Sequence, residues 1–354
     1  MAHPQADKYP ASHSGAPTPD YLIVGGGVAG CALTYALSVR GARVTLLEKG
    51  RIGGAGASSV PMALLNPYRG RSARANDLDL AGLTEMRRLV DALETQNLDH
   101  GVHQRGVLRI ASSVKQAKTW RKREGVRWLE PEEVAPIYHA PFGGFLVERG
   151  GWLEPHKFLR ALLTATRGNG ANVFEDCHVQ EVGEHTSSQR YKEVKALWRG
   201  SSHLFRAKTL IFCTGANPTF GSALGVEGLE YIAGEVIGLK TDARLPHALA
   251  GAIYGAQTGE RVLLGGNHRP AERTDESAPA QLQKSGSWFI PALKEAELVS
   301  VWTGVRAKRE DNMPVVAEVR KNVWFFGALA GRGFLCAAYL AEGLAEELAG
   351  VTST

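Results

Sequence analysis

Residues 21–48 read YLIVGGGVAGCALTYALSVRGARVTLLE, and this stretch predicts the fold of the first part of the chain. Tyr21–Val24 is a short apolar run of the kind found in buried parallel strands. Cys31–Arg40 carries apolar side chains at helical spacing, and Arg43–Leu47 is a second apolar run that ends at Glu48. The order of elements is therefore strand, glycine-rich turn, helix, strand and acidic residue.

The three spaced glycines of this turn each have a physical purpose in a site for a dinucleotide. Gly25 permits a tight turn, Gly27 lets the backbone approach a pyrophosphate, and Gly30 lets the helix pack closely on the strand. The helix N-terminus then directs free N–H groups and the positive end of its dipole toward the phosphates. Glu48 follows the second strand, where a carboxylate accepts hydrogen bonds from a ribose. A glycine-rich turn without a ligand is the alternative, but it leaves the position of Glu48 unexplained.

Composition and charge are typical of an ordinary globular protein. The 354 residues are 44% hydrophobic and 22% charged, which argues against a mostly disordered or fibrous chain. At roughly 150 residues per domain, this length predicts about two domains. The net charge of +5 permits an anionic partner without requiring one. No stretch approaches about 18 consecutive apolar residues, so the sequence predicts no membrane-spanning helix and no membrane partner.

The cysteines and histidines predict neither a disulfide framework nor a metal site. The 4 cysteines lie far apart and form no CxxC pair, and the 11 histidines show no HExxH motif. Reduced cysteines are typical of the cytoplasm, which is the expected location. Residues 1–19 are rich in Pro, Ser and Ala and lack the apolar core of a secretory signal, so we expect a disordered tail.

Three later segments place small residues where a long cofactor needs close contact with the backbone. Gly53–Pro67 begins with glycines, alanines and serines just after the second strand, and an ordinary flexible loop is its alternative. Leu210–Ala216 predicts another buried strand that ends in a small-residue turn. Val323–Phe334 predicts a strand and a second glycine turn, followed by a helix over 335–348. The N-terminus of that helix can stabilise negative charge at the far end of a cofactor.

In this order, the motifs resemble the FAD-dependent oxidoreductases of the D-amino-acid oxidase type, the group that contains glycine oxidase and sarcosine oxidase. The resemblance covers nearly all of residues 21–348. It includes Gly151–Pro155 before a helix, and Gly304–Arg306 followed by Asp311. It implies an enzyme with FAD as its cofactor. Ala307–Arg309 contains no cysteine to match the covalent flavin attachment of some sarcosine oxidases, so the expected FAD is noncovalent.

The resemblance implies an α/β fold with two lobes, each built from separate parts of the chain. One lobe is expected to be Rossmann-like and to bind FAD. The other is expected to be a discontinuous α+β substrate lobe that contains a mostly antiparallel sheet. The expected ranges are 20–75, 145–225 and 303–350 for the FAD-binding lobe, and 76–144 and 226–302 for the substrate lobe.

The family likeness also implies which residues contact FAD. They lie in the two glycine turns, in the loop after the second strand, in the turn that follows the third buried strand, and in a strand near the adenine end. The expected set is Gly25, Gly27, Val28, Ala29, Gly30, Glu48, Lys49, Ala57, Ser58, Ser59, Val179, Thr214, Gly215, Gly331, Arg332, Gly333 and Phe334.

Three residues are candidates for the catalytic end of the site. Arg306, at the end of a strand expected at 298–302, matches the arginine that binds a substrate carboxylate through two parallel hydrogen bonds, and an ion pair with Asp311 or a nearby glutamate is its alternative. Tyr254 places a hydroxyl over the flavin face, or is a half-buried tyrosine of a sheet. Arg332 reaches the flavin or the substrate, or is a solvated arginine of a loop.

A flavin accepts a hydride at N5 from the carbon that bears the amine, so the protein has mainly to position that carbon. The first predicted function is therefore oxidation of the C–N bond of a small amine or amino acid of the N-substituted glycine type. Within the family, Thr303–Pro314 and Ala328–Ala341 resemble the oxidase half of the bifunctional tRNA 5-methylaminomethyl-2-thiouridine biosynthesis proteins. That likeness implies an alternative: oxidative removal of the carboxymethyl group from carboxymethylaminomethyl-uridine in tRNA. The companion methyltransferase domain is absent, and Ala63 stands where the family usually has glycine.

A basic run with interleaved tryptophans is the feature that bears on tRNA as a partner. Cations beside aromatic faces suit an RNA backbone and stacked bases, whereas a solvated helix face with its tryptophans turned inward is the alternative. A noncatalytic nucleotide-binding protein is a third hypothesis, which a missing substrate anchor would favour. The sequence leaves the oligomeric state and the electron acceptor open. The run consists of Lys115, Lys118, Arg121, Lys122, Arg123 and Arg127, with Trp120 and Trp128.

Overall fold

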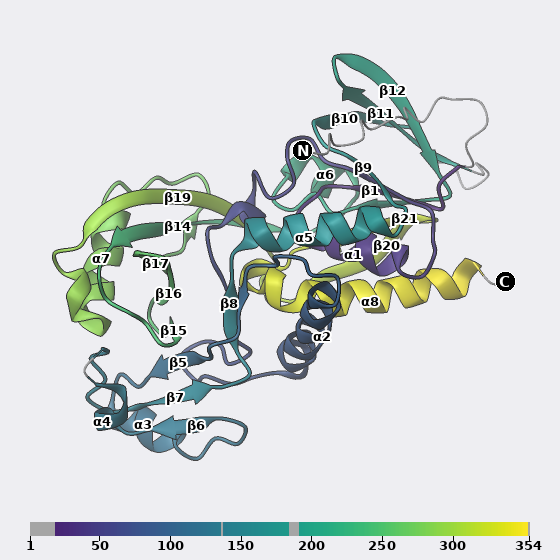
Figure 1. Cartoon of the computed structure of the whole chain (residues 1–354). Helices are drawn as coiled ribbons and strands as arrows, with labels where there is room; N and C mark the ends of the chain where they lie inside the picture. The colour runs from purple at the N-terminus through teal and green to yellow at the C-terminus, as the bar shows by residue number, and fades with distance from the viewer. Residues whose placement is uncertain (1–17, 136, 184–190, 353–354) are drawn as a thin grey trace.

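The computed structural model describes residues 18–135, 137–183 and 191–352, with side chains to residue 350. The tail predicted over 1–19 lies outside these ranges except for its last two residues. Two lobes lie side by side in Figure 1, one with helices around a central sheet and the other with a larger sheet. The α/β class predicted from the resemblance is confirmed.

The first sheet has the strand order β20-β21-β13-β1-β2-β9, and the strand predicted at residue 21 lies near its centre. All neighbouring strands run parallel except β20, which closes one edge antiparallel to β21. A buried parallel strand needs apolar side chains on both faces, and this explains the unbroken apolar run in β1. The strands are β1 (Tyr21–Val24), β2 (Val44–Leu47), β9 (Asn172–Phe174), β13 (Thr209–Phe212), β20 (Val315–Arg320) and β21 (Val323–Gly327).

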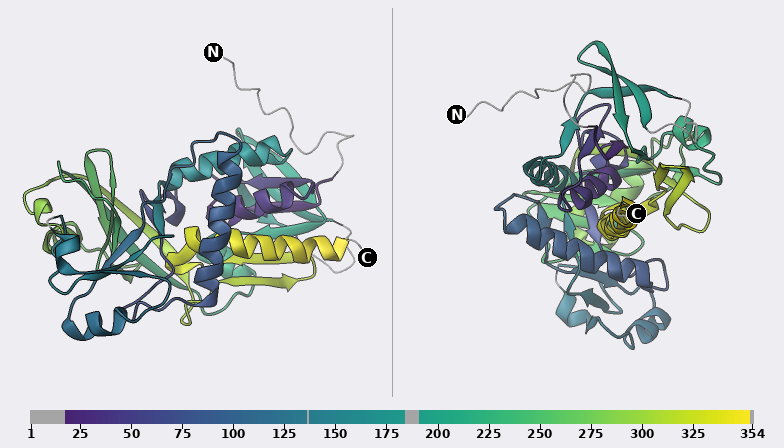
Figure 2. Two further views of the ribbon diagram at one scale, coloured as in Figure 1. Left: turned by 60° about the horizontal axis from the view of Figure 1, so that its bottom comes forward. Right: turned by 90° about the vertical axis from the view of Figure 1, so that its right-hand side faces the viewer.

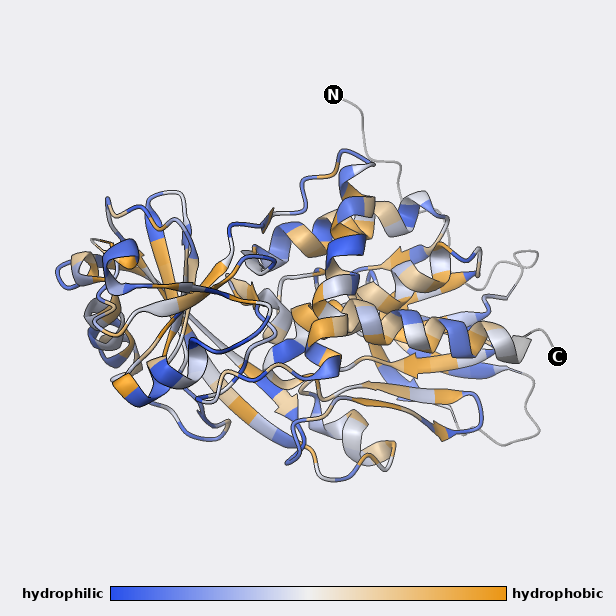
Figure 3. Cartoon of the chain, turned by 90° about the horizontal axis from the view of Figure 1, so that it is seen from below, coloured by the Kyte–Doolittle hydropathy of each residue, from blue (hydrophilic) through white to orange (hydrophobic). Residues whose placement is uncertain are grey.

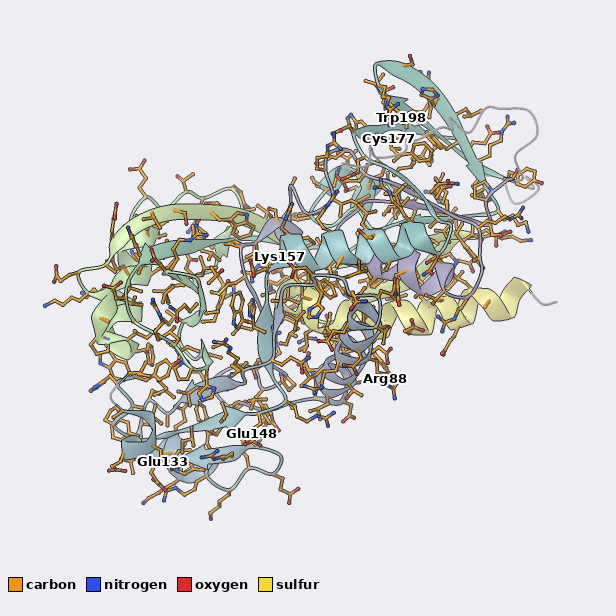
Figure 4. All side chains as sticks on the ribbon, in the orientation of Figure 1. Arg88, Glu133, Glu148, Lys157, Cys177 and Trp198 are labelled. Atoms are coloured by element: carbon orange, nitrogen blue, oxygen red, sulfur yellow. The ribbon has the colours of Figure 1, made fainter. Side chains whose placement is uncertain are left out.

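Each face of this sheet has its own hydrophobic core. Tyr21 and Ile23 pack with the helices on one face, whereas Leu22 and Val24 pack with a small three-stranded sheet on the other. In that small sheet Cys177 lies opposite Trp198, and both side chains are labelled in Figure 4. The covering elements are α1 (Val28–Ser38), α2 (Asp77–Glu94), α5 (Pro155–Gly168) and α8 (Gly333–Thr352) on the helical face, and β10 (Cys177–Val182), β11 (Lys192–Trp198), β12 (Ser201–Ala207) and α6 (Pro218–Ala223) on the other.

The second lobe contains a nine-stranded sheet, which is mostly antiparallel as predicted. Its strands β15 and β5 pair in parallel. The strand predicted at 298–302 is β19, and it extends to Lys308 because it pairs with β14 along the whole length of that strand. Arg306 therefore lies inside the strand rather than at its end. The strands are β5 (Val107–Ile110), β6 (Arg127–Leu129), β7 (Gly144–Val147), β14 (Glu230–Lys240), β15 (Ala248–Ala250), β16 (Tyr254–Thr258), β17 (Arg261–Gly265), β18 (Arg269–Pro270) and β19 (Glu297–Lys308).

The remaining elements connect the lobes or cover the outside of the second sheet. A short sheet of order β3-β8-β4 leads from the first lobe to the second. These elements are β3 (Ala63–Leu65), β4 (Val102–His103), β8 (Gly151–Leu153), α3 (Val114–Trp120), α4 (Pro131–Val134), α7 (Ala278–Phe289), η1 (Ala57–Ser59), η2 (Pro291–Leu293) and η3 (Ala330–Arg332).

The packing of helix α2 indicates where the boundary between the two lobes lies. It crosses α8 in Figure 2, and its apolar side chains belong to the same core as α1 and α8. The sequence division assigned this helix to the substrate lobe through the range 76–144. We propose that the boundary lies after α2, because a helix belongs with the lobe whose core it completes.

Figure 3 shows hydrophobic residues on the strands of both lobes and on the helix surfaces that face them. None of the helices in the described ranges is both long enough and apolar enough to span a bilayer.

Candidate active site

A cavity of about 1140 Å³ lies between the two lobes, and both glycine turns line it. Its wall also takes residues from β10 and β21 of the first lobe and from β14, β16 and β19 of the second. The tertiary structure therefore brings the two ends of the chain to one site. Every site residue predicted from the sequence lines this cavity except Gly30 and Arg332.

The first glycine turn is too crowded for side chains at two of its positions. Gly25 has a φ of +109°, and a Cβ there would lie 2.4 Å from the carbonyl oxygen of Cys213. A Cβ on Gly30 would lie 1.9 Å from the carbonyl oxygen of Gly25. Gly30 therefore allows α1 to approach the turn, and its absence from the cavity wall fits this packing role.

The loop at Ala57–Ser59 is ordered by contacts with both lobes. It forms the short helix η1, in which the Val28 N–H donates to Ser58 Oγ at 3.0 Å. From the second lobe, Trp302 Nε1 donates to Ser59 Oγ at 3.0 Å. The alternative of an ordinary flexible loop does not describe this segment, because a backbone N–H of α1 and a side chain of β19 both donate hydrogen bonds to it.

The acidic residue after β2 contacts the backbone around the first turn. Glu48 Oε2 accepts a hydrogen bond from the Gly26 N–H at 2.6 Å, and Oε1 accepts one from the Gly50 N–H at 3.0 Å. Glu48 and the exposed Lys49 both line the cavity. Each carboxylate oxygen has a second lone pair, so the predicted contact with a ribose remains open to Glu48.

The second glycine turn joins β21 to α8, and Gly331, Gly333 and Phe334 line the cavity there. Arg332 instead turns into the protein. Its side chain is 8% exposed, and its Nε lies 3.4 Å from Oδ1 of Asp79, which is 1% exposed. Arg332 is therefore not the solvated loop arginine of the alternative, and its contact with the flavin or the substrate stays a prediction beside this buried ion pair with α2. Only the tertiary contact with α2 reveals this partner, which stands far from Arg332 in the sequence.

We expect Asp79→Asn to lower the free energy of unfolding by about 3–5 kcal/mol, because it leaves the Arg332 guanidinium buried without a counter-charge. Thermal or urea unfolding measures the loss. Asp77→Asn is the matched control, since Asp77 is exposed in the first turn of the same helix. Equal losses in the two variants would contradict a stabilising pair.

Arg306 lies at the cavity wall between two glycines. A Cβ on Gly234 would lie 3.1 Å from Arg306 Nη2, and a Cβ on Gly331 would lie 3.4 Å from Nη1. No carboxylate in the described ranges forms an ion pair with Arg306, and Asp311 instead pairs with Arg309 at 3.7 Å. The alternative of a structural ion pair with Asp311 or a nearby glutamate is therefore not what the structure contains.

Two further groups face the same end of the cavity. Tyr254 lies on β16, and burial raises the pKa of its phenol, although Arg306 opposes this shift. His268, which the sequence reasoning missed, has a pKa lowered by burial and by Arg306. Both groups are therefore neutral near pH 7. No local motif marks His268, which lies between β17 and β18, two strands that both pair with β14.

A family model described as FAD dependent oxidoreductase (DAO) matches residues 20–347 of the chain. The chain belongs to this family. Glycine oxidase from Geobacillus kaustophilus (strain HTA426) is 26% identical over 326 residues, which cover 84% of each sequence. The crystal structure of glycine oxidase from Geobacillus kaustophilus shares the fold, with a TM-score of 0.80 and 24% identity over 94% of this chain and 95% of that one.

Another relative is the tRNA 5-methylaminomethyl-2-thiouridine biosynthesis bifunctional protein MnmC of Maricaulis maris (strain MCS10), which is 27% identical over 345 residues. The match covers 93% of this chain but 52% of that protein, so the chain spans about half the length of this relative. The FAD-dependent oxidoreductase family, the enzyme class and the cofactor predicted from the motifs are confirmed.

Two observations on the cavity of this oxidoreductase fit FAD. A Cβ on Gly27 would lie 3.2 Å from Ser58 Oγ, so glycine keeps open the space beside the N-terminus of α1 where a pyrophosphate binds. Thr214 lines the wall, and its Oγ1 is buried with no hydrogen-bond partner among the described residues. A buried hydroxyl is rarely left unpaired, so a ligand at this position completes its hydrogen bonding.

Thr214→Val tests this role of the hydroxyl. We expect FAD to bind about 10-fold more weakly, because one hydrogen bond to the cofactor is lost. The unfolding temperature of the FAD-free protein should stay the same or rise, since the hydroxyl has no protein partner to lose. Fluorescence titration with FAD and thermal unfolding separate the two effects, and unchanged FAD affinity would contradict the contact.

The basic run considered for RNA binding is partly paired within the chain. Arg121 Nη2 lies 2.6 Å from Glu130 Oε2, and Arg127 Nη2 lies 3.5 Å from Glu133 Oε1. Trp120 is buried, so it does not offer a face for stacking. These contacts match the alternative of a solvated helix face with tryptophan turned inward, and RNA contact by this run remains a prediction.

Proposed function

We propose that this oxidoreductase oxidises the C–N bond of a small amine or amino acid of the N-substituted glycine type. The observation that carries the proposal is the Arg306 guanidinium, which lines the FAD-binding cavity without a carboxylate partner in the described ranges. A substrate carboxylate provides that partner, and the planar guanidinium holds it with two parallel hydrogen bonds. A noncatalytic nucleotide-binding protein has no use for such an anchor.

The residues at this end of the cavity position the substrate. Arg306 fixes the carboxylate, so the carbon between carboxylate and amine takes a defined place. Tyr254, neutral at working pH, donates its hydroxyl to the bound carboxylate. His268, also neutral, adds no further positive charge beside Arg306. When bound, FAD supplies the oxidising chemistry by accepting a hydride from the carbon that bears the amine.

We propose that FAD is held noncovalently. Cys177 and Cys213 line the cavity, but burial raises the pKa of the Cys177 thiol to about 12 and that of Cys213 further. A thiol rather than a thiolate is present at these positions, and the thiolate is the nucleophile. Acid precipitation of the purified protein should release all flavin into the supernatant, and yellow colour left in the pellet would contradict this prediction.

The proposed function is tested by the absorbance of the purified protein under anaerobic conditions. Glycine, sarcosine and small D-amino acids are added in turn, and loss of the flavin bands with one of them identifies a small-amine oxidoreductase. If the bands bleach only with tRNA that carries carboxymethylaminomethyl-uridine, the function is the modification of tRNA. The similarity to the Maricaulis maris protein supports that second candidate, which presents the same N–CH2–COO⁻ unit. A flavin that no such compound bleaches contradicts both candidates.

A further inference from the structure

The side chain of a second arginine, Arg69, lies close to Arg306 at the cavity wall. A Cβ on Gly331 would lie 3.2 Å from Arg69 Nη2 and 3.4 Å from Arg306 Nη1. Both side chains line the cavity. Arg69 comes from the loop between β3 and α2, whereas Arg306 comes from β19, so two separate segments of the chain each supply one guanidinium group.

The charges of these two guanidinium groups are not balanced by the protein. Within the described parts of the chain, neither arginine forms an ion pair with a carboxylate. Arg69 Nη1 donates to the carbonyl oxygen of Gly331 at 3.2 Å, which is a neutral partner. Asp79, the acid that influences Arg69, already pairs with Arg332 at 3.4 Å. This end of the cavity therefore carries the charges of both guanidinium groups without a carboxylate paired to either.

The charges at this end of the cavity shift the pKa values of neighbouring groups. Burial lowers the pKa of Arg69, and the nearby Arg332 and Arg306 lower it further, while Asp79 raises it. Arg69 and Arg306 also contribute to the lowered pKa of His268. Arg69 still carries its positive charge, because the pKa of a guanidinium begins far above neutrality. This end of the cavity thus places the cations of Arg69 and Arg306 beside the neutral imidazole of His268.

We propose that Arg69 and Arg306 together bind a substrate that carries two carboxylates on either side of a secondary amine, such as an N-carboxymethyl amino acid. The inference rests on the proposed function, in which Arg306 binds the first carboxylate. A substrate with one carboxylate leaves the second guanidinium desolvated and unpaired, which is costly. A second carboxylate pairs with it, so each of the two arginines holds one end of the substrate across the amine.

The test uses two ethers that lack the oxidisable amine, methoxyacetate with one carboxylate and diglycolate with two. Each is titrated into the FAD-loaded protein, and the shift of the flavin spectrum reports its Kd. Wild type should bind diglycolate about 10- to 100-fold more tightly, the range for a charge-assisted hydrogen-bonded pair. Arg69→Met should abolish that preference and change the Kd of methoxyacetate less than about twofold. Arg71→Met is the control, because Arg71 is exposed on the same loop and does not line the cavity.

The outcomes separate this inference from the proposed function. If methoxyacetate binds in an Arg306-dependent way but diglycolate binds no more tightly, the two-carboxylate inference is wrong and the proposed function stands. If Arg69→Met weakens both ethers equally, both arginines hold a single carboxylate, and the inference is again wrong. If Arg69→Met instead loses FAD, Arg69 serves the cofactor rather than the substrate. If neither ether perturbs the flavin, the proposed function and the inference both fail.

Discussion

Arg306→Met should reduce kcat/KM for the amine substrate by about 100- to 1000-fold while FAD stays bound. The guanidinium provides two charge-assisted hydrogen bonds to the substrate carboxylate, and their loss costs about 3–4 kcal/mol of transition-state stabilisation. Methionine keeps the apolar length of the side chain, so the packing between Gly234 and Gly331 is retained. The measurement is the rate of flavin bleaching under anaerobic conditions as substrate concentration is varied.

Arg309→Met is the matched control for this prediction. Arg309 follows the same strand, but it is exposed, does not line the cavity and pairs with Asp311 at 3.7 Å. The flavin of the Arg309→Met variant should bleach at the wild-type rate. If the Arg306 variant also bleaches at the wild-type rate with unchanged KM, Arg306 does not bind the substrate, and the function proposed for this cavity loses its main support.

Gly30→Ala should destabilise the protein by about 3 kcal/mol or more and remove most of its FAD. The added Cβ would lie 1.9 Å from the carbonyl oxygen of Gly25, a backbone atom that moves only if α1 moves away from β1. Overpacking of a well-filled core costs about 1–3 kcal/mol even where side chains can adjust, and here a backbone segment must shift. Thermal unfolding and the ratio of flavin to protein absorbance measure the two effects.

Gly343→Ala tests whether the effect at Gly30 comes from crowding rather than from the change of residue. Gly343 also lies inside a helix, α8, but a Cβ there would meet no atom within 4 Å. Alanine should stabilise the protein by up to about 1 kcal/mol, because alanine favours the helix over glycine. A stable, fully flavinated Gly30→Ala protein would show that the first turn tolerates a side chain.

Much of the first lobe was predictable because its signals are local. The apolar run at Tyr21–Val24 indicates a strand that is buried on both faces. The spacing of Gly25 and Gly30 indicates how closely the next helix approaches that strand. Both depend on the conformation of residues near one another in sequence. The antiparallel second sheet and the substrate arginine were predicted from the family resemblance instead. The sequences of short strands with little periodicity do not indicate which strands they pair with.

At the substrate end of the site, the local sequence does not predict which arginine is paired with a carboxylate. Arg332 and Arg69 are both arginines beside glycines in the sequence, and nothing nearby distinguishes them. The structure turns Arg332 inward to Asp79 on α2, whereas Arg69 projects to the cavity beside Arg306. Which arginine is neutralised depends on how α2 packs against α8.

The sequence by itself therefore determined the dinucleotide turn, the buried strands around it and the positions at which only glycine fits, because sterics and hydrophobic burial act over a few residues. The tertiary structure decided which charges remain unpaired. A charge is balanced by whatever lies next to it in space, and Arg306 and Arg332 come from a part of the chain far from Arg69 and Asp79.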